Sequence, residues 1–121
     1  MVLDADDINA MHWDLLWENA SSTSDFAAQT VEISLSEYTH VGILFVFSKT
    51  LHDFMPFVVF PVSESFRTNF PDNQGTVLWR TGSANVNGVT FTKGQQRTTG
   101  GTTSDSNSVV IPMYIFGING I

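Results

Sequence analysis

The sequence predicts an all-β fold, an antiparallel β-sandwich or jelly roll with a short N-terminal helix or connector. Apolar residues recur at every second position in several short segments, as they do in half-buried strands. Turn-forming residues separate these segments at short intervals, and no long helical period follows residue 12. A chain of 121 residues suits one domain with its own core. We therefore assign residues 1–12 to a connector and residues 13–121 to a single sandwich domain.

The first segment predicts a short helix, because Asp4 is a good N-cap and two further Asp residues are favourable in a first turn. Both a fraying terminus and a connector to an upstream stalk fit this helix. The period then changes to two. Trp13, Leu15 and Trp17 alternate with their neighbours, which predicts an early strand.

The middle of the chain contains three predicted strands. Residues 29–35 alternate cleanly, with their apolar side chains inward. Residues 41–48 form a nearly continuous apolar run, which predicts a central strand covered on both faces. Residues 57–60 lie between Pro56 and Pro61, and prolines at both ends of a run favour an edge strand.

The last third begins with a strand at residues 76–80, after a Pro-Asp-Asn-Gln-Gly turn. Residues 86–94 contain an Asn-Gly pair, which predicts a hairpin. Residues 94–108 are polar and lack aromatic residues, so they form the longest predicted loop and are expected to be functional or disordered. Residues 109–118 close the chain as an apolar strand.

Charge excludes several classes of partner. The net charge is −7, which opposes binding to nucleic acid and to an anionic membrane surface. Cysteine is absent, so disulfides and zinc–thiolate sites are excluded. The acidic N-terminus does not resemble a secretory signal, and no apolar run is long enough for a membrane helix. The basic residues are scattered along the sequence: Lys49, Arg67, Arg80, Lys93 and Arg97.

The sequence contains no recognisable catalytic or metal-binding motif. His12, His40 and His52 do not have the spacing of metal ligands, and we expect neither a metal nor a cofactor. No nucleophile elbow or phosphate-binding loop is present. The carboxylates do not single out an acid–base pair, which glycoside hydrolysis requires. We therefore expect a protein that is not an enzyme.

The aromatic and amide side chains are the candidates for binding. Five phenylalanines cluster where the periodicity is irregular, and they are candidates for a subunit interface. They are Phe54, Phe57, Phe60, Phe66 and Phe70. Tryptophan beside amide and acidic side chains is typical of sugar recognition. The candidate ligand-binding residues are Asn69, Asp72, Asn73, Gln74, Trp79, Arg80, Asp105 and Asn107.

Two blocks of sequence resemble a known module. Residues 15–38 resemble the pattern LWxNxxxxxxFAxQTVxLxLSxY, and residues 108–118 resemble the ending CIPYxIYGI. Both patterns belong to a β-rich module at the C-terminal end of tail-fibre and minor structural proteins of siphophages that infect Gram-positive bacteria. Residues 86–94 resemble its VxxxGIxFxxG strand, whereas residues 52–70 match nothing in it. The resemblance implies a virion protein, assembled as a homotrimer and without catalytic residues.

Three hypotheses about function follow from the sequence. In the first, the chain is a receptor-binding tip domain for host attachment that recognises a host cell-surface polysaccharide, with its polar loops as the binding site. The net charge then favours a neutral glycan over a phosphate polymer. In the second, it is a purely structural head-decoration, capsid or tail-assembly module that contacts another virion protein. In the third, it is a depolymerase fragment, which requires a cleft with two close carboxylates.

Overall fold

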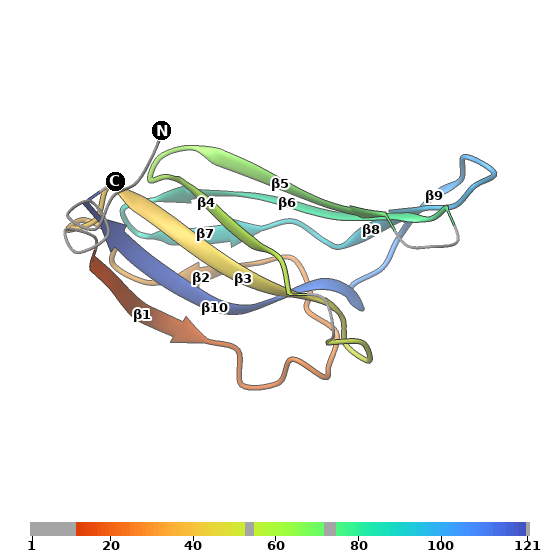
Figure 1. The fold of residues 1–121 in the computed structure, drawn as a ribbon, viewed down its shortest axis with the longest axis horizontal. Coiled ribbons are helices and arrows are strands. Elements are labelled where there is room, and N and C mark those ends of the chain that lie inside the picture. The colour runs from red at the N-terminus through yellow and green to blue at the C-terminus, as the bar shows by residue number, and fades with distance from the viewer. Residues whose placement is uncertain (1–11, 53–54, 72–74, 121) are drawn as a thin grey trace, which may run out of the picture.

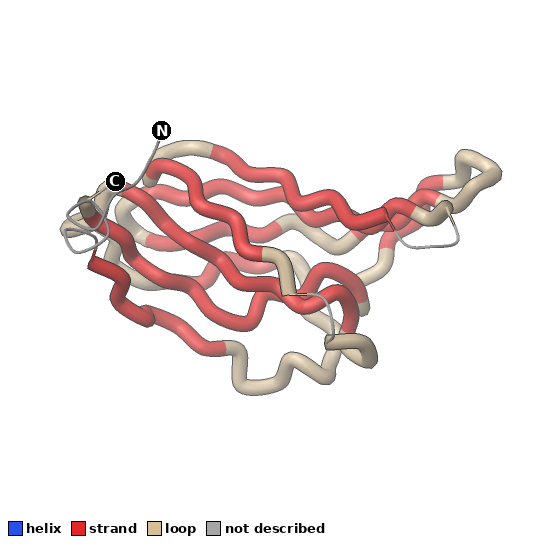
Figure 2. Tube along the Cα trace, in the orientation of Figure 1, coloured by secondary structure: helices blue, strands red, loops and turns tan. Residues whose placement is uncertain are grey.

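A computed structural model describes residues 12–52, 55–71 and 75–120 of the chain. Within these residues there are ten strands and no helix, and the strands form two antiparallel sheets that pack face to face (Figures 1 and 2). The predicted antiparallel β-sandwich is therefore confirmed. The helix predicted near Asp4 lies outside the described residues.

The first sheet, sheet A, has the strand order β1-β10-β3-β4. The second, sheet B, has the order β2-β7-β6-β8-β9, with β5 paired to the other edge of β6. The strands are β1 (His12–Glu18), β2 (Gln29–Glu32), β3 (His40–Ser48), β4 (Phe57–Pro61), β5 (Ser65–Pro71), β6 (Val77–Asn85), β7 (Gly88–Phe91), β8 (Gln95–Arg97), β9 (Thr103–Asp105) and β10 (Val109–Asn119).

Sheet A is built around the two most apolar strands. β3 lies between β10 and β4, so the prediction of a central strand is confirmed. β4 lies at the edge of the sheet, as its flanking prolines predict. β1 forms the other edge by pairing with β10, so the first and last strands of the domain are neighbours.

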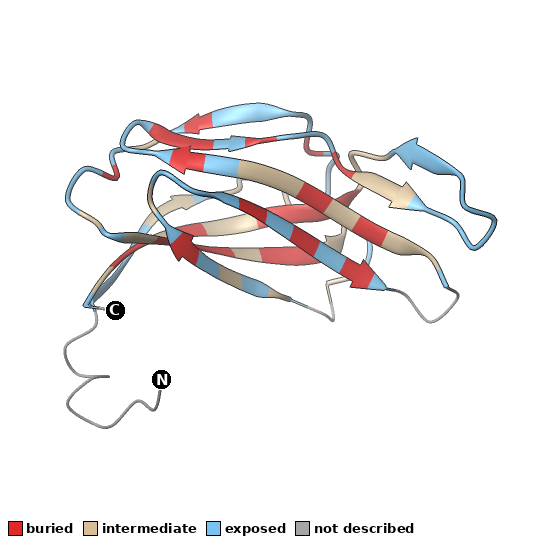
Figure 3. Ribbon diagram, turned by 90° about the horizontal axis from the view of Figure 1, so that it is seen from above, coloured by how far each residue is buried: buried red, intermediate tan, exposed pale blue. Residues whose placement is uncertain are grey.

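Sheet B is organised by β6, the strand with the most neighbours. The whole length of β5 pairs with one edge of β6, over Val77–Ser83. The other edge pairs first with β8, over Val77–Trp79, and then with β7, over Gly82–Asn85. β5 was not predicted, because its two phenylalanines belong to the aromatic cluster in which the periodicity of the sequence is irregular. Along β5 buried and exposed residues nevertheless alternate without exception (Figure 3).

Two turns in this region decide the shape of sheet B. The predicted hairpin joins β6 to β7, with Asn85 opposite Gly88, so Val86 and Asn87 form the turn. The predicted long loop at residues 94–108 is instead a second hairpin. β8 and β9 pair through Gln95–Asp105 and Arg97–Thr103, and the hairpin projects from one end of the sandwich (Figure 1). Its backbone finds partners on β6, which its polar composition does not reveal.

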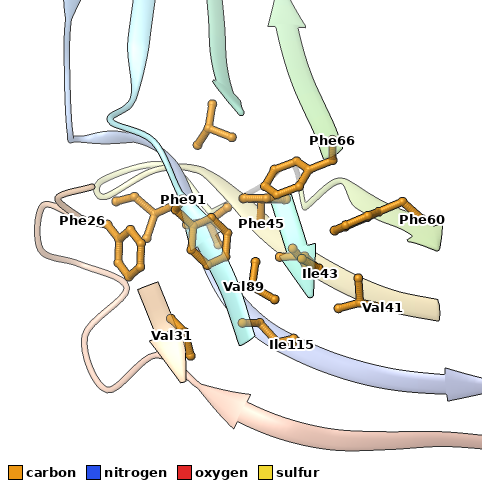
Figure 4. Packing of buried hydrophobic residues seen from close by; sticks show 14 of the residues in the cluster. Phe26, Val31, Val41, Ile43, Phe45, Phe60, Phe66, Val89, Phe91 and Ile115 are labelled. Atoms are coloured by element: carbon orange, nitrogen blue, oxygen red, sulfur yellow. The ribbon is translucent and has the colours of Figure 1, made fainter. Parts of the chain in front are cut away.

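The core between the sheets is rich in aromatic side chains. Phe45 of sheet A meets Phe66 and Phe91 of sheet B, with ring centroids 5.9 and 6.4 Å apart (Figure 4). Phe26, from the loop after β1, closes one side of this cluster by an edge-on contact with Phe91 at 5.4 Å. Aromatic pairs of this geometry stabilise a core beyond the area that they bury.

The core accounts for most of the phenylalanines that sequence analysis proposed for a subunit interface. Phe60, Phe66 and Phe70 are at most 8% exposed and face the opposite sheet. That interpretation is therefore wrong for these three residues, because the regular alternation of β4 and β5 directs them inward. Phe57 lies on the outer face and is 38% exposed. Phe54 lies outside the described residues.

Candidate functional site

A row of polar and aromatic side chains crosses the outer face of sheet B near the β8–β9 hairpin. Asn69 pairs with Trp79, Trp79 with Gln95, and Gln95 with Asp105. Residues paired directly across antiparallel strands face the same side of the sheet. Asn69 and Trp79 have buried neighbours along β5 and β6, so their side chains, and the row paired with them, lie on the outer face of sheet B. We call Asn69, Trp79, Gln95 and Asp105 the outer row.

Hydrogen bonds connect the outer row from one strand to the next. The Trp79 indole Nε1 donates to Gln95 Oε1 at 3.1 Å, and Gln95 Nε2 donates to Asp105 Oδ1 at 3.3 Å. Asp105 Oδ2 forms an ion pair with Lys93 Nζ, and the two atoms lie 2.9 Å apart. The hydrogen bond from Lys93 is the main reason that the pKa of Asp105 lies below its ordinary value, so this carboxylate stays ionised.

Arg67 covers one face of the Trp79 ring. Its guanidinium carbon lies 5.2 Å from the ring centroid, and its Nε donates to Asn69 Oδ1 at 2.9 Å. The stack and the hydrogen bond together fix a side chain that is otherwise long and flexible. The outer row therefore presents a planar guanidinium above an aromatic ring, with amide and carboxylate groups beside it.

A shallow hollow of about 360 Å³ begins next to this stack. Thr81, which pairs with Arg67, forms its near wall. Gly82 also lines the hollow, and its missing side chain leaves room for the buried Phe66 ring: a Cβ there would lie 2.6 Å from that ring. Its volume lies at the lower end of the range of about 300–1,000 Å³ that is common for ligand sites. Five side-chain hydroxyl groups line it, from Ser65, Thr81, Ser83, Thr90 and Thr92.

The structure brings together three of the eight predicted ligand-binding residues: Asn69, Trp79 and Asp105. Arg80 does not join them, because neighbouring residues of a strand face opposite sides, and it is fully buried in the core. Asn107 is also apart from the row; its Oδ1 accepts from the backbone N–H of Gly94 at 3.2 Å. Asp72, Asn73 and Gln74 lie outside the described residues.

Sequence analysis missed three members of this site: Arg67, Lys93 and Gln95. Arg67 lies twelve positions before Trp79, and the pairing of β5 with β6 was not predicted. A signal was present, because Arg67, Asn69 and Pro71 alternate with buried residues along β5. Gln95 was placed in the predicted loop of residues 94–108, for which the sequence does not predict which way a side chain points, and Lys93 was placed at the end of the predicted hairpin without a partner.

The outer face of sheet A has a different character. Trp13 of β1 stacks on Phe57 of β4 at 5.3 Å, and both rings contact Phe116 of β10. The rings can meet across the sheet because Phe57 lies directly over Gly42 of β3. Trp13 is 45% exposed and Phe57 is 38% exposed. We call Trp13, Phe57 and Phe116 the aromatic patch.

Residues 15–38 and 108–118 come together in sheet A. Residues 15–18 of β1 belong to the first of these blocks and residues 109–118 of β10 to the second, and the two strands pair. Tyr38, at the end of the first block, lies over Gly117 in the last block and donates a hydrogen bond to Asp14 Oδ2 at 2.8 Å. The two blocks therefore contact each other through sheet A, whereas residues 29–32 of the first block form β2 at the edge of sheet B.

No helix among residues 12–52, 55–71 and 75–120 is long and apolar enough to cross a membrane. In the same residues, no three His, Asp or Glu side chains gather in the manner of a metal site. No protein-family model matches the chain, and no curated protein or solved structure shows significant similarity to it.

Proposed function

We propose that this protein is a non-catalytic, glycan-binding module of a virion, and that the outer face of sheet B is its binding surface. The observation that carries the proposal is the Arg67–Trp79 stack within the outer row. Aromatic and guanidinium planes pack against the apolar faces of sugar rings, while amide, carboxylate and hydroxyl groups bond to sugar hydroxyls. The row and the neighbouring hollow offer all of these groups on one surface.

The rigidity of this surface supports binding as its role. Its polar groups belong to four neighbouring strands and are held by bonds to one another, so little conformational entropy is lost when a ligand binds. Asp105 is the only carboxylate of the outer row, and Lys93 and Gln95 already engage it. Glycoside hydrolysis uses two carboxyl groups that flank the bond to be cleaved, so this arrangement favours binding over cleavage.

The virion setting is supported by the resemblance of residues 15–38 and 108–118 to the tail-fibre module. In such a setting the domain serves as a receptor-binding tip that attaches the particle to a host surface polysaccharide. Several copies on one particle convert weak contacts with single sugars into firm attachment, because the later contacts form at high effective concentration.

Two matched tryptophan variants test glycan binding. Trp79→Leu removes the ring under Arg67, and Trp13→Leu makes the same change on the opposite sheet. We expect wild type and Trp13→Leu to bind the same members of a panel of bacterial surface oligosaccharides, and Trp79→Leu to lose binding. Titration with soluble oligosaccharides, by calorimetry, removes any effect of avidity. Equal binding by both variants, or no binding by the wild type to any host envelope fraction, would refute the proposal.

The aromatic patch favours a second role, assembly with other copies of the chain. Trp13 and Phe57 come from the two edge strands of sheet A, and their stacked rings are exposed on its outer face; exposed apolar surface of this kind is common at subunit interfaces. This role agrees with the homotrimer that the resemblance implies, and on its own it describes a purely structural virion protein. Light scattering of wild type and of Trp13→Ser/Phe57→Ser tests it. A wild-type protein that is monomeric at micromolar concentration would refute it.

A further inference from the structure

The basic residues are not scattered once the chain is folded. Arg80 is buried in the core, and Lys49 pairs with Asp25 at 2.9 Å. The other three, Arg67, Lys93 and Arg97, all lie on the outer face of sheet B, on β5 or along the segment that forms β8. The chain has a net charge of −7, yet this face concentrates most of its exposed positive charge.

Arg67 is the member of this group that is prepared to bind an anion. Its Nε is occupied by Asn69, and its plane is held against Trp79, so its position is fixed. Within the described residues no carboxylate forms an ion pair with it, and no hydrogen bond engages its two Nη groups. Two parallel N–H groups in this geometry match the two oxygens of a carboxylate or phosphate.

The surroundings of Arg67 add to the positive field. Lys93 is matched by Asp105, so that pair contributes little net charge. Arg97 adds a second positive charge further along β8, two positions beyond Gln95. Glu32, the acidic residue of β2, pairs with Gly88 at the far end of β7. Among the described residues around the outer row, the side-chain charges therefore sum to a positive value, opposite in sign to the charge of the whole protein.

We infer that the sugar bound at the outer row carries an anionic group, a carboxylate or a phosphate, which pairs with the Nη groups of Arg67. This inference rests on the proposed glycan binding and changes its expected ligand. The net charge of the chain predicts a neutral glycan, but a ligand is attracted by the local field at its site rather than by the total charge. The remainder of the sugar then extends from Arg67 towards the hydroxyl-lined hollow beside Thr81.

Small sugars that differ only in charge test this inference on the full chain. We would titrate methyl glucoside, methyl glucuronide and glucose 6-phosphate into labelled protein and follow the Arg67 and Trp79 side-chain N–H signals by NMR. Arg67→Gln removes the positive charge, and Arg67→Lys keeps the charge but lacks the two parallel N–H groups. Arg97→Gln is a matched control on the same face. The glucuronide and the phosphate arms distinguish the two kinds of anion.

We expect at least one charged sugar to bind about tenfold more tightly than the glucoside, because a charge-assisted hydrogen bond is worth that much or more. Arg67→Gln should abolish this difference, Arg67→Lys should reduce it, and Arg97→Gln should retain most of it. Equal binding of charged and neutral sugars would overturn the inference and leave glycan binding intact. A charged sugar that perturbs the signals of Arg97 instead of those of Arg67 would also overturn the inference and leave glycan binding intact. Failure of all three sugars to bind would count against both proposals.

Discussion

The Nε of Arg80 donates a hydrogen bond of 2.7 Å to the carbonyl oxygen of Val110, and this bond joins the two sheets. The guanidinium also donates to the carbonyls of Thr92, at 2.7 Å, and Val109, at 3.1 Å. It lies 5.4 Å from the centroid of the Phe26 ring. Burial lowers the pKa of Arg80 to about 10, so the group is charged at neutral pH. Its partners are carbonyl oxygens and an aromatic ring, and no carboxylate among the described residues pairs with it.

Arg80→Met should destabilise the domain by about 2–4 kcal/mol, because three backbone carbonyls lose a charged donor while buried. Val110 adds to the effect, since its φ of 50° is unusual for a β-branched residue and is held in place by this bond. Urea unfolding measures the change. Arg97→Met, an exposed match, should change stability by no more than about 0.5 kcal/mol. If Arg80→Met proves as stable as wild type, the prediction is wrong, because the free-energy cost of burying the charged guanidinium then equals the stabilisation from its hydrogen bonds.

Thr68→Val should stabilise the protein by about 1 kcal/mol. Thr68 pairs with Arg80 in the register of β5 and β6, it is 4% exposed, and its hydroxyl finds no hydrogen-bond partner among the described residues. Valine keeps the shape and removes the unsatisfied polar atom. A thermal-denaturation comparison with Thr103→Val, at an exposed position of β9, separates this gain from the general β-preference of valine. A loss of stability in Thr68→Val would mean that the hydroxyl is bonded after all.

Gly117→Ala should destabilise sheet A by about 1–3 kcal/mol through overpacking. A Cβ at this position would lie 2.6 Å from the Tyr38 ring, which covers the glycine. Gly100→Ala is the control, because nothing lies within 4 Å of its Cβ position. Comparable stabilities for the two variants would show that Tyr38 does not rest on β10.

Asp14→Asn should lower the pKa of the Tyr38 phenol towards its ordinary value. In the wild type, the hydrogen bond to Asp14 raises that pKa, because the bond requires the protonated hydroxyl. A raised pKa in the folded state means that the contribution to stability is complete below the unfolded pKa, about 10, and is lost as pH rises through the folded value. Ultraviolet titration of the tyrosines in wild type and variant measures the shift; identical curves would exclude the bond.

The fold class followed from the sequence because period-two alternation reports which face of a strand is buried, whichever strands pair with it. Alternation predicted β1 and β2 in this way, whereas β3 and β10 were predicted from nearly continuous apolar runs, β4 from its flanking prolines and β7 from the Asn-Gly hairpin. The binding site depends on pairing. Asn69, Trp79 and Asp105 were each nominated as polar or aromatic residues, but their alignment requires the register of β5, β6, β8 and β9.

Arg80 was predicted to bind ligand, and the structure places it in the core instead. Its residue type suggested an exposed ligand-binding group, and its position between Trp79 and Thr81 placed it on the buried face instead. A charged residue enters a core only where backbone carbonyls are left to receive it, and these come from β10, thirty residues later, and from Thr92. No local pattern in the sequence encodes that arrangement.

Glycan binding by the outer face of sheet B can be located by mapping which amide signals of the protein a bound oligosaccharide perturbs in NMR spectra. We expect perturbations at Arg67–Asn69, Val77–Thr81 and Gln95, with the indole signal of Trp79 among the largest. The same oligosaccharide should leave Trp13 and Phe57 unchanged. Perturbations centred on Trp13 and Phe57, with Trp79 silent, would contradict this proposal and move the binding surface to sheet A.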